Sequence, residues 1–411
     1  MENCYKVAII GGGPAGIMAA LTAKTKENRV VILEKNPFLG KKLLLTGKGR
    51  CNLTTDREIP EIVQAFGRKG KFLYGAFTRF SSQDLRNFFE KRGVGLKIER
   101  GGRVFPQSDR SATILNCLKK ELALRKITVF YHFNVCRVFF KKGLYHLESP
   151  AGNVLAEKLI IATGGKSYPQ TGSTGDGYLF AKSFGHQIIK PAPALVPLRV
   201  SDPKITALAG LSLKNVSLSF FNRDKLFTRE FGEMLFTHFG ISGPIVLKAS
   251  KEVYQQLKKQ TGVTASIDLK PALNKTILQK RIYREIHLMP QKEYQTLLKN
   301  LLPKSLINYF IDRTGISPHQ KNSSLSKAQV ETLIAALKNL TFAISATMPL
   351  EMAIITSGGV DIAAIDPKTM ASKIAPNLYF AGEIIALDGP TGGYNLQKAF
   401  STGWVAGFSS R

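Results

Sequence analysis

The first forty residues alternate between apolar runs and a glycine turn in a regular order. Residues 5–10 form a mostly apolar run that predicts a buried strand, and residues 30–33 form a second one. Between them, a glycine-rich turn at 11–16 continues as an alanine- and leucine-rich stretch to about residue 26, which predicts a helix. Strand, helix and strand in so short a span predict a βαβ unit.

Three later segments carry apolar runs that end in small or polar residues. Residues 158–161 predict a buried strand that runs into Ala162-Thr163-Gly164, and residues 377–380 predict another that ends in Gly382-Glu383. A glycine pair at 392–393 precedes a helix that we expect to reach about residue 406. The remaining pattern in this part of the chain predicts helices over 58–100 and 112–124, a strand over 128–135 and a hairpin over 138–147.

The middle of the chain has a different texture. Alternating segments at 213–221 and 263–269 predict a small β domain, and residues 275–340 are polar, basic and helix-patterned. We therefore predict an α/β fold in which a Rossmann-like nucleotide-binding domain is interrupted by two insertions. The expected boundaries are 1–190 and 341–411 for the two parts of this domain, 191–270 for a β-rich domain and 271–340 for a helical domain.

The glycine turn has the spacing of a dinucleotide-binding fingerprint. Gly11 allows the tight turn, Gly13 lets backbone amides approach a pyrophosphate at the helix N-terminus, and Gly16 lets helix and strand pack closely. Glu34, at the end of the second strand, is placed to accept hydrogen bonds from a ribose 2′-hydroxyl. The alternative is a glycine turn in some other α/β protein.

The later motifs indicate FAD, bound noncovalently, in preference to NAD. A strand ending in Gly382-Glu383 matches the place where flavoproteins hold the ribityl chain or pyrophosphate with an acid. The amides at the start of the helix after Gly393 can stabilise negative charge on a reduced flavin ring. A single bound NAD leaves both motifs unexplained. No second dinucleotide fold is predicted, so NAD(P)H would dock transiently as reductant or a separate reductase would supply electrons.

Two side chains are candidates for proton transfer. Cys51 lies in a polar loop, between Arg50 and Asn52, that is close in sequence to the nucleotide turn. The alternative is an ordinary loop with a buried thiol. His238 is the second candidate, although a structural histidine explains it as well. The cysteines are scattered without metal-ligand spacing, which predicts no metal site and a reducing cytoplasm.

Charge is the unusual feature of the composition. The 58 basic and 29 acidic residues leave a net charge of +29, and no run is long enough to span a membrane. Residues 41–142 hold 23 basic and 8 acidic side chains, a surplus of 23 − 8 = 15. This surplus suggests a basic face for a polyanion, most plausibly RNA. A generally basic proteome or a solvated surface explains the charge equally well.

Taken together, these motifs resemble the BaiN/HI0933-like family of FAD-binding oxidoreductases. The resemblance runs from end to end and rests on Gly11 to Gly16, Gly40 to Leu43, Gly49 to Asn52, Gly102 to Pro106, Ala162 to Gly165, Leu235 to His238 with Gly243-Pro244, Ala381 to Glu383, and Gly392 to Asn395. It implies a two-dinucleotide-binding-type flavoprotein fold split by the inserted domains. The expected cofactor contacts are Gly11, Gly13, Pro14, Ala15, Gly16, Glu34, Lys35, Lys42, Arg50, Cys51, Asn52, Val135, Ala162, Thr163, Gly164, Gly382, Glu383, Gly392, Gly393, Tyr394 and Asn395.

The resemblance also implies a choice of substrates. Activities in the family include reduction of conjugated enones in steroids, oxidation of a small aminoketone, and reduction of a uridine in large-subunit ribosomal RNA. Our first hypothesis is reduction of a uridine C5=C6 bond in 23S ribosomal RNA to dihydrouridine, because it accounts for the charge. The alternatives are a reductase or oxidase of a small unsaturated or aminoketone metabolite, and a non-catalytic RNA-binding flavoprotein. The sequence predicts no oligomeric state.

Overall fold

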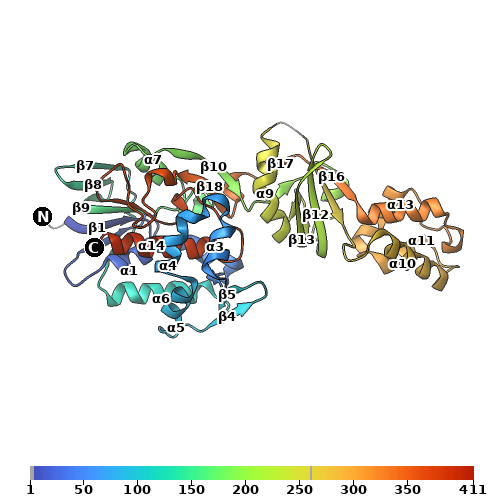
Figure 1. Cartoon of the computed structure of the whole chain (residues 1–411), viewed down its shortest axis with the longest axis horizontal. Coiled ribbons are helices and arrows are strands. Elements are labelled where there is room, and N and C mark those ends of the chain that lie inside the picture. Colours follow the sequence, from blue (N-terminus) through green and yellow to red (C-terminus); the bar gives the residue numbers. More distant parts are fainter. Residues whose placement is uncertain (1–3, 260–261) are drawn as a thin grey trace. The chain divides into compact units, whose positions relative to one another are not determined.

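The computed structural model describes residues 4–259 and 262–411, which form two compact units. The first unit contains Met1–Ala194 and Leu350–Arg411, and the second contains Leu195–Pro349 (Figure 1). Within the described residues, no helix is long and apolar enough to cross a membrane.

A seven-stranded sheet is the centre of the first unit. Its order is β6-β2-β1-β9-β8-β7, and β19 also pairs with β9. Strands β6, β2, β1, β9 and β19 run parallel, whereas β8 and β7 are antiparallel additions beside β9. The α/β fold predicted from the apolar runs is confirmed by this sheet. The strands are β1 (Cys4–Ile10), β2 (Val30–Leu33), β6 (Thr128–Phe130), β7 (Arg137–Lys141), β8 (Leu144–Ser149), β9 (Gly152–Ile161) and β19 (Leu378–Phe380).

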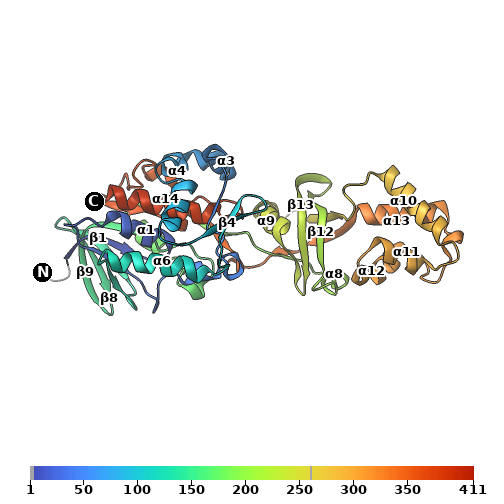
Figure 2. The same cartoon turned by 90° about the horizontal axis from the view of Figure 1, so that it is seen from below.

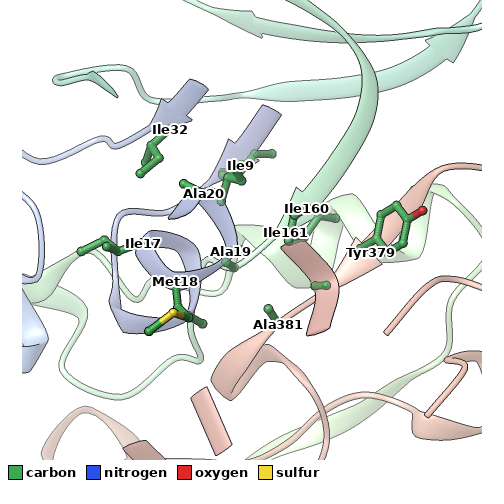
Figure 3. Close-up of a cluster of buried hydrophobic side chains, with 14 of the residues drawn as sticks. Ile9, Ile17, Met18, Ala19, Ala20, Ile32, Ile160, Ile161, Tyr379 and Ala381 are labelled. Carbon is green, nitrogen blue, oxygen red and sulfur yellow. The ribbon is translucent and has the colours of Figure 1, made fainter. Parts of the chain in front are cut away.

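Two helices from opposite ends of the chain pack against each other beside this sheet. Helix α1 (Pro14–Ala23) follows β1, and α14 (Tyr394–Ser409) is the last element of the chain. A Cβ on Gly403 would lie 2.3 Å from the Ala15 carbonyl oxygen, so glycine is what lets the two helices approach. The apolar residues between them and the sheet form the core, to which Ile9 and Ile160 of the sheet and Met18 of α1 all belong (Figure 3).

The predicted strand over 128–135 is too long. β6 ends at Phe130, and the chain then turns back over the end of β2. The turn has left-handed backbone at His132 (φ 55°), and the Phe133 N–H donates to the Glu34 carbonyl oxygen at 3.0 Å. These contacts divert the backbone from the sheet, so Val135 is buried in a loop instead of a strand.

The segment between β2 and β6 contains several short helices and a small sheet. Its helices are α2 (Lys41–Leu45), α3 (Ile59–Ala65), α4 (Tyr74–Arg79), α5 (Ser82–Glu90) and α6 (Ser111–Leu124). The helix predicted through residue 100 is wrong at its end, because residues 96–99 pair with 103–106 as an antiparallel hairpin. That hairpin, with a third short strand, consists of β3 (Thr54–Thr55), β4 (Leu96–Glu99) and β5 (Arg103–Pro106).

The rest of the first unit adds a second small sheet. β10 (Ile188–Ala194) and β18 (Ile355–Val360) pair antiparallel, and α7 (Asp176–Ser183) packs beside them. Strand β18 is therefore supplied by the C-terminal part of the chain. A short 3-10 turn, η8 (Gly382–Ile384), follows β19 and places Glu383 next to β18.

The second unit combines a sheet and helices around one hydrophobic core. The antiparallel sheet has the order β16-β15-β12-β13-β14-β11-β17, and the helices α10 to α13 group at one end of it (Figure 2). The chain returns to the sheet after the helices, because β16 pairs with β15. The elements are β11 (Leu198–Arg199), β12 (Ser212–Asn222), β13 (Lys225–Thr237), β14 (Gly240–Ser242), α9 (Pro244–Leu257), β15 (Val263–Asp268), α10 (Lys275–Leu288), α11 (Tyr294–Leu301), α12 (Ile307–Thr314), α13 (Lys327–Lys338), β16 (Leu340–Ile344) and β17 (Ala346–Thr347).

Candidate active site

The glycine turn after β1 forms an open cradle at the N-terminus of α1. Gly11 has φ 107°, and a Cβ on Gly16 would lie 1.9 Å from the Gly11 carbonyl oxygen, so both positions require glycine. A Cβ on Gly13 would meet nothing within 4 Å, so this residue faces open space. No side chain caps α1, so the N–H groups of Ala15 and Gly16 have no side-chain partner, whereas the Ile17 N–H donates to the Gly13 carbonyl at 2.9 Å. A pyrophosphate fits such a cradle.

Glu34 is fixed beside this cradle. Its side chain is 7% exposed, and one carboxylate oxygen accepts from the Gly12 N–H at 2.8 Å. The other oxygen accepts from the backbone and side-chain N–H groups of Asn36 at 2.8 and 2.7 Å. Three donors orient the carboxylate at the end of β2, where the fingerprint places the ribose acid. Lys35, the next residue, instead forms an ion pair with Asp176 at 2.7 Å.

A second polar cluster surrounds Glu383. Its carboxylate pairs with Lys42 Nζ at 2.8 Å, accepts from Ser167 Oγ at 3.1 Å, and accepts from the Thr356 N–H at 2.9 Å. Burial raises the pKa of this carboxyl, but the charge and hydrogen bond of Lys42, the Thr356 N–H and the charge of Lys398 together outweigh burial and hold the pKa below its ordinary value. A Cβ on Gly165 would lie 2.7 Å from a Glu383 oxygen, so the glycine strand end leaves the space that the acid occupies.

The N-terminus of α14 is held close to β3. Gly393 has φ 95°, and a Cβ there would lie 2.2 Å from the Thr54 carbonyl oxygen. In the orientation that satisfies both polar ends of its amide, Asn52 accepts from the Gly393 N–H at 3.1 Å and donates to the Thr54 carbonyl at 3.2 Å. The Asn395 side chain closes the preceding loop by bonding both the N–H and the carbonyl of Gly389, at 2.9 and 2.8 Å.

The three side chains of the Arg50-Cys51-Asn52 segment lie in different surroundings. Arg50 pairs with Glu99 and Asp109 and lies over the Phe105 ring, with 4.2 Å to the ring centroid. Cys51 has left-handed backbone (φ 63°), is 0% exposed, and its burial raises the pKa of the thiol to about 12. Asn52 alone of the three contacts the α14 glycine pair. The structure thus brings Asn52 to the site and directs the Arg50 guanidinium into an ion cluster.

The remaining predicted residues occupy different settings. Ala162 is buried at the end of β9, and the hydroxyl of Thr163 is buried without a hydrogen-bond partner among the described residues. Tyr394 packs against Phe66 and Leu387 in a small apolar cluster. His238 lies exposed in the tight turn between β13 and β14 of the second unit, with its ring 4.9 Å from that of Phe239.

Sequence reasoning missed Ser167 and Thr356, which complete the Glu383 cluster. The Thr356 hydroxyl accepts from the N–H groups of Lys166 and Ser167 at 2.7 and 3.0 Å. Each lies two residues from a glycine, at Gly165 and Gly358, which was the available signal, but only the long-range hydrogen bonds between residues 166–167 and Thr356 show that they meet. Across the described residues, no group of three or more His, Cys, Asp and Glu is arranged to hold a metal ion.

These residues fit a dinucleotide with a flavin ring. The fit rests on the open cradle at Gly13, the oriented Glu34 carboxylate and the unpartnered Thr163 hydroxyl. All lie at the carboxyl end of the parallel strands, where β1 separates β2 from β9. The class defined by fold and site is the FAD-binding flavoproteins, and the chain is an FAD-dependent oxidoreductase. It belongs to the HI0933-like family, whose Rossmann-domain model matches residues 5–409.

Individual proteins of known name resemble the chain over its whole length. A protein of Clostridium scindens named 3-dehydro-bile acid delta(4,6)-reductase is 32% identical over 404 residues, covering 98% of each chain. A protein of Haemophilus influenzae named ribosomal RNA dihydrouridine synthase is 30% identical over 415 residues, covering 100% of this chain and 99% of the relative. Among solved structures, the 3-ketosteroid-delta4-(5alpha)-dehydrogenase of Rhodococcus jostii shares the fold, with a TM-score of 0.53 at 14% identity over 100% of this chain and 97% of its own.

Proposed function

We propose that this protein reduces a uridine C5=C6 bond in 23S ribosomal RNA to dihydrouridine. The observation that carries the proposal is the net charge of +29, which neither FAD binding nor a small neutral substrate requires. The full-length relative named ribosomal RNA dihydrouridine synthase supports it. A base stacked in a helix cannot reach a flavin ring, so the target uridine must be single-stranded or splayed out.

The chain's own residues have separable tasks in this reaction. The amides of the α1 N-terminus would hold the pyrophosphate, Glu34 would bind ribose hydroxyls, and the amides at the start of α14 would offset negative charge at the flavin ring. The paired Glu383 would hold the ribityl or pyrophosphate region. FAD, when bound and reduced, supplies the hydride that the C6 carbon of uracil accepts.

A proton must also reach the C5 carbon. The proposed donor is Cys51, because a thiol can deliver a proton at neutral pH if it is held beside the ring; in the closed loop, burial raises its pKa to about 12. Protein atoms enclose this thiol completely, so the role requires the glycine-containing loop before it to open toward the substrate. The loop has left-handed backbone at Gly47, Lys48 and Gly49 as well as at Cys51. His238 remains the second proposed proton-transfer residue.

A small-molecule substrate is the second candidate function. The relative named 3-dehydro-bile acid delta(4,6)-reductase favours it, with 32% identity across nearly the whole chain. A uracil ring and a carbonyl-conjugated steroid alkene pose the same chemical problem, because each accepts hydride at the carbon remote from the carbonyl and a proton at the adjacent one. The same site therefore serves either substrate, and only the surfaces around it distinguish RNA from a metabolite.

The electron source is proposed to be NAD(P)H, docking transiently. Within the described residues, one βαβ unit, β1–α1–β2, carries the dinucleotide fingerprint. Anaerobic mixing of the flavin-loaded protein with NADH or NADPH, followed by its absorbance, tests this step. If neither nucleotide bleaches the flavin, a protein reductase supplies the electrons. If no reductant and substrate together turn the flavin over, the protein is a non-catalytic RNA-binding flavoprotein.

The deciding experiment is mass spectrometry of nucleosides from 23S ribosomal RNA. Cells with the gene, without it, and with the deletion complemented are compared. Loss of one dihydrouridine on deletion and its return on complementation is the expected result. Unchanged dihydrouridine overturns the RNA substrate and moves the proposal to the small conjugated carbonyl compound.

A further inference from the structure

Four basic side chains with no acidic partner among the described residues lie close in sequence to an exposed aromatic ring on the segment 67–79. Arg68, Lys69, Lys71 and Arg79 are all exposed, and among the described residues none of them forms an ion pair. Tyr74, between them in sequence, is 55% exposed. We name this surface the 68–79 patch, after Arg68, Lys69, Lys71, Tyr74 and Arg79.

The patch differs from much of the basic segment that contains it. Several arginines in residues 41–142 are paired with carboxylates, namely Arg57 with Glu61, Arg86 with Asp56, and Arg92 with Glu121, whereas Arg100 and Arg110 form no ion pair among the described residues. Such pairs leave little positive potential for a partner. The uncompensated positive charge of residues 41–142 therefore lies on side chains that form no ion pair, and those of the 68–79 patch are among them.

The elements that carry the patch pack directly on the loop before α14. Phe66, Leu73 and Phe77 are buried in one cluster with Leu387, and Tyr394 packs against the same cluster. A Cβ on Gly389 would lie 2.9 Å from the Phe66 ring. The buried side chains of the segment 59–79 thus pack beside the start of α14, and the exposed side chains of its 67–73 turn and of α4 form the patch.

We infer that the 68–79 patch binds the single-stranded RNA segment that flanks the target uridine. The lysines and arginines neutralise backbone phosphates, and the Tyr74 ring provides a face on which one unpaired base stacks. A small neutral substrate has no phosphates to bind the basic side chains and no chain of bases to stack on Tyr74. This inference rests on the proposed function, because it names how that function's substrate is held.

The test separates stacking from charge. Binding of a fluorescent single-stranded 23S fragment is measured by anisotropy over a salt series, for the flavin-loaded wild type, Tyr74→Ala, Tyr74→Phe and Lys69→Glu/Lys71→Glu. Tyr74→Ala should weaken binding by roughly 5- to 150-fold, whereas Tyr74→Phe should bind like the wild type. The double lysine variant should lower the slope of log affinity against log salt by about 1.4, since each single-strand phosphate contributes about 0.7.

Lys141→Glu is the matched control. Lys141 is exposed and unpaired among the described residues, but it lies at the end of β7, the edge strand of the large sheet. For each lysine replaced by glutamate, this variant should weaken RNA binding less than the double lysine variant does. Flavin absorbance and NAD(P)H-driven bleaching confirm in each variant that the site is intact.

The outcomes distinguish this inference from the proposed function. If the wild type binds and reduces the RNA but the patch variants match it, the RNA is held elsewhere and the inference is wrong. If the wild type neither binds RNA nor forms dihydrouridine, the proposed function has failed first. Equal effects of Tyr74→Phe and Tyr74→Ala would show that the hydroxyl, not the stacking face, makes the contact, and would overturn the stacking role.

Discussion

Glu34 and Glu383 are both carboxylates beside glycine turns, but different partners hold them. Glu34 is oriented by three N–H donors from its own neighbourhood in the fold. Glu383 depends on the ammonium group of Lys42, which is 341 positions away in sequence. The first is fixed by local turn chemistry, and the second by a long-range ion pair. The two carboxylates should therefore respond differently to substitution.

Replacing Glu383 by glutamine should lower the free energy of unfolding by about 1–3 kcal/mol, because Lys42 loses its anionic partner in a partly buried site. The pKa of Glu383 is lowered in the folded protein, so the ionised group stabilises the fold above its ordinary pKa of 4.5. That contribution is lost as the pH falls from there through the folded-state value. Urea unfolding of the wild type and Glu383→Gln at pH 7 and pH 4 measures the gap, which should shrink at the lower pH.

The control for this variant is Glu148→Gln. Glu148 pairs with Arg137 at 3.7 Å, and the Arg137 side chain is 70% exposed. Its substitution should change stability by at most about 0.5 kcal/mol. Equal losses in the two variants would contradict a special role for the Lys42 pair.

Cys51→Ala should reduce turnover of RNA by roughly 10²-fold or more while the protein retains flavin, if the thiol delivers the proton. Burial raises the pKa of the thiol to about 12 only while the loop is closed, so the rate through the open form should fall as the pH rises through the ordinary thiol pKa of 9.0. Single-turnover reoxidation of the reduced flavin by RNA measures both effects. Cys136→Ala, at an exposed cysteine, is the control. Full turnover in Cys51→Ala would assign the thiol to packing.

The elements that form the site are short, and glycine decides how closely they approach. The turn between β1 and α1 uses Gly16 for packing and Gly13 for open space, although both belong to one motif. Likewise, Gly393 allows α14 to begin against β3. Glycines of one sequence motif are therefore required for different physical reasons, close packing at one position and open space at another.

Gly13→Ala and Gly16→Ala should separate these reasons. Gly13 has φ −82°, which alanine adopts readily, so its substitution should leave the stability of the flavin-free protein within about 1 kcal/mol. The added methyl group stands in the pyrophosphate cradle, so FAD affinity should fall about tenfold or more. Gly16→Ala should instead destabilise the protein by roughly 2 kcal/mol or more, because the Cβ would overlap the Gly11 carbonyl. Thermal unfolding and flavin-fluorescence titration give the two readouts, and unchanged affinity in Gly13→Ala would contradict the cradle.

At the scale of the whole molecule, chemistry and charge are distributed differently. The first unit alone contains the glycine cradle, Glu34, the Glu383 cluster and the α14 N-terminus. The second unit has its own core of sheet and helices, and its segment from Lys275 onward is rich in lysine and arginine. Positive charge thus belongs to both units, as expected if it serves a large polyanion.

Salt should therefore divide the activity of the protein into two parts. Raising the salt from 50 to 200 mM should lower kcat/KM for RNA by at least about tenfold, because bound counterions are released when RNA binds. Reduction of the flavin by NAD(P)H should change little over the same range. Stopped-flow reduction and dihydrouridine formation measure the two steps. Equal insensitivity of both would point to a small neutral substrate.

The sequence by itself determined the βαβ unit, because glycine spacing, an apolar strand and an acid at its end all lie within the first 34 residues. The cofactor and the family could also be predicted, but from motifs that run along the whole chain, such as Gly382-Glu383 and Gly392 to Asn395. Sequence pattern failed where local propensity met tertiary contacts. Residues 96–99 left the predicted helix to pair with β5, and β6 stopped at Phe130 because the chain turns over β2.

Only the tertiary structure decided how the distant motifs meet. It joined Lys42 to Glu383, brought Asn52 to Gly393, and added Ser167 and Thr356 to the cluster. It also turned Arg50 toward Glu99 and Asp109, although Arg50 stands next to Cys51 in the same motif. Ion pairs and hydrogen bonds act over a few ångströms, so pairing between residues hundreds of positions apart becomes visible only when the sheet sets their separation.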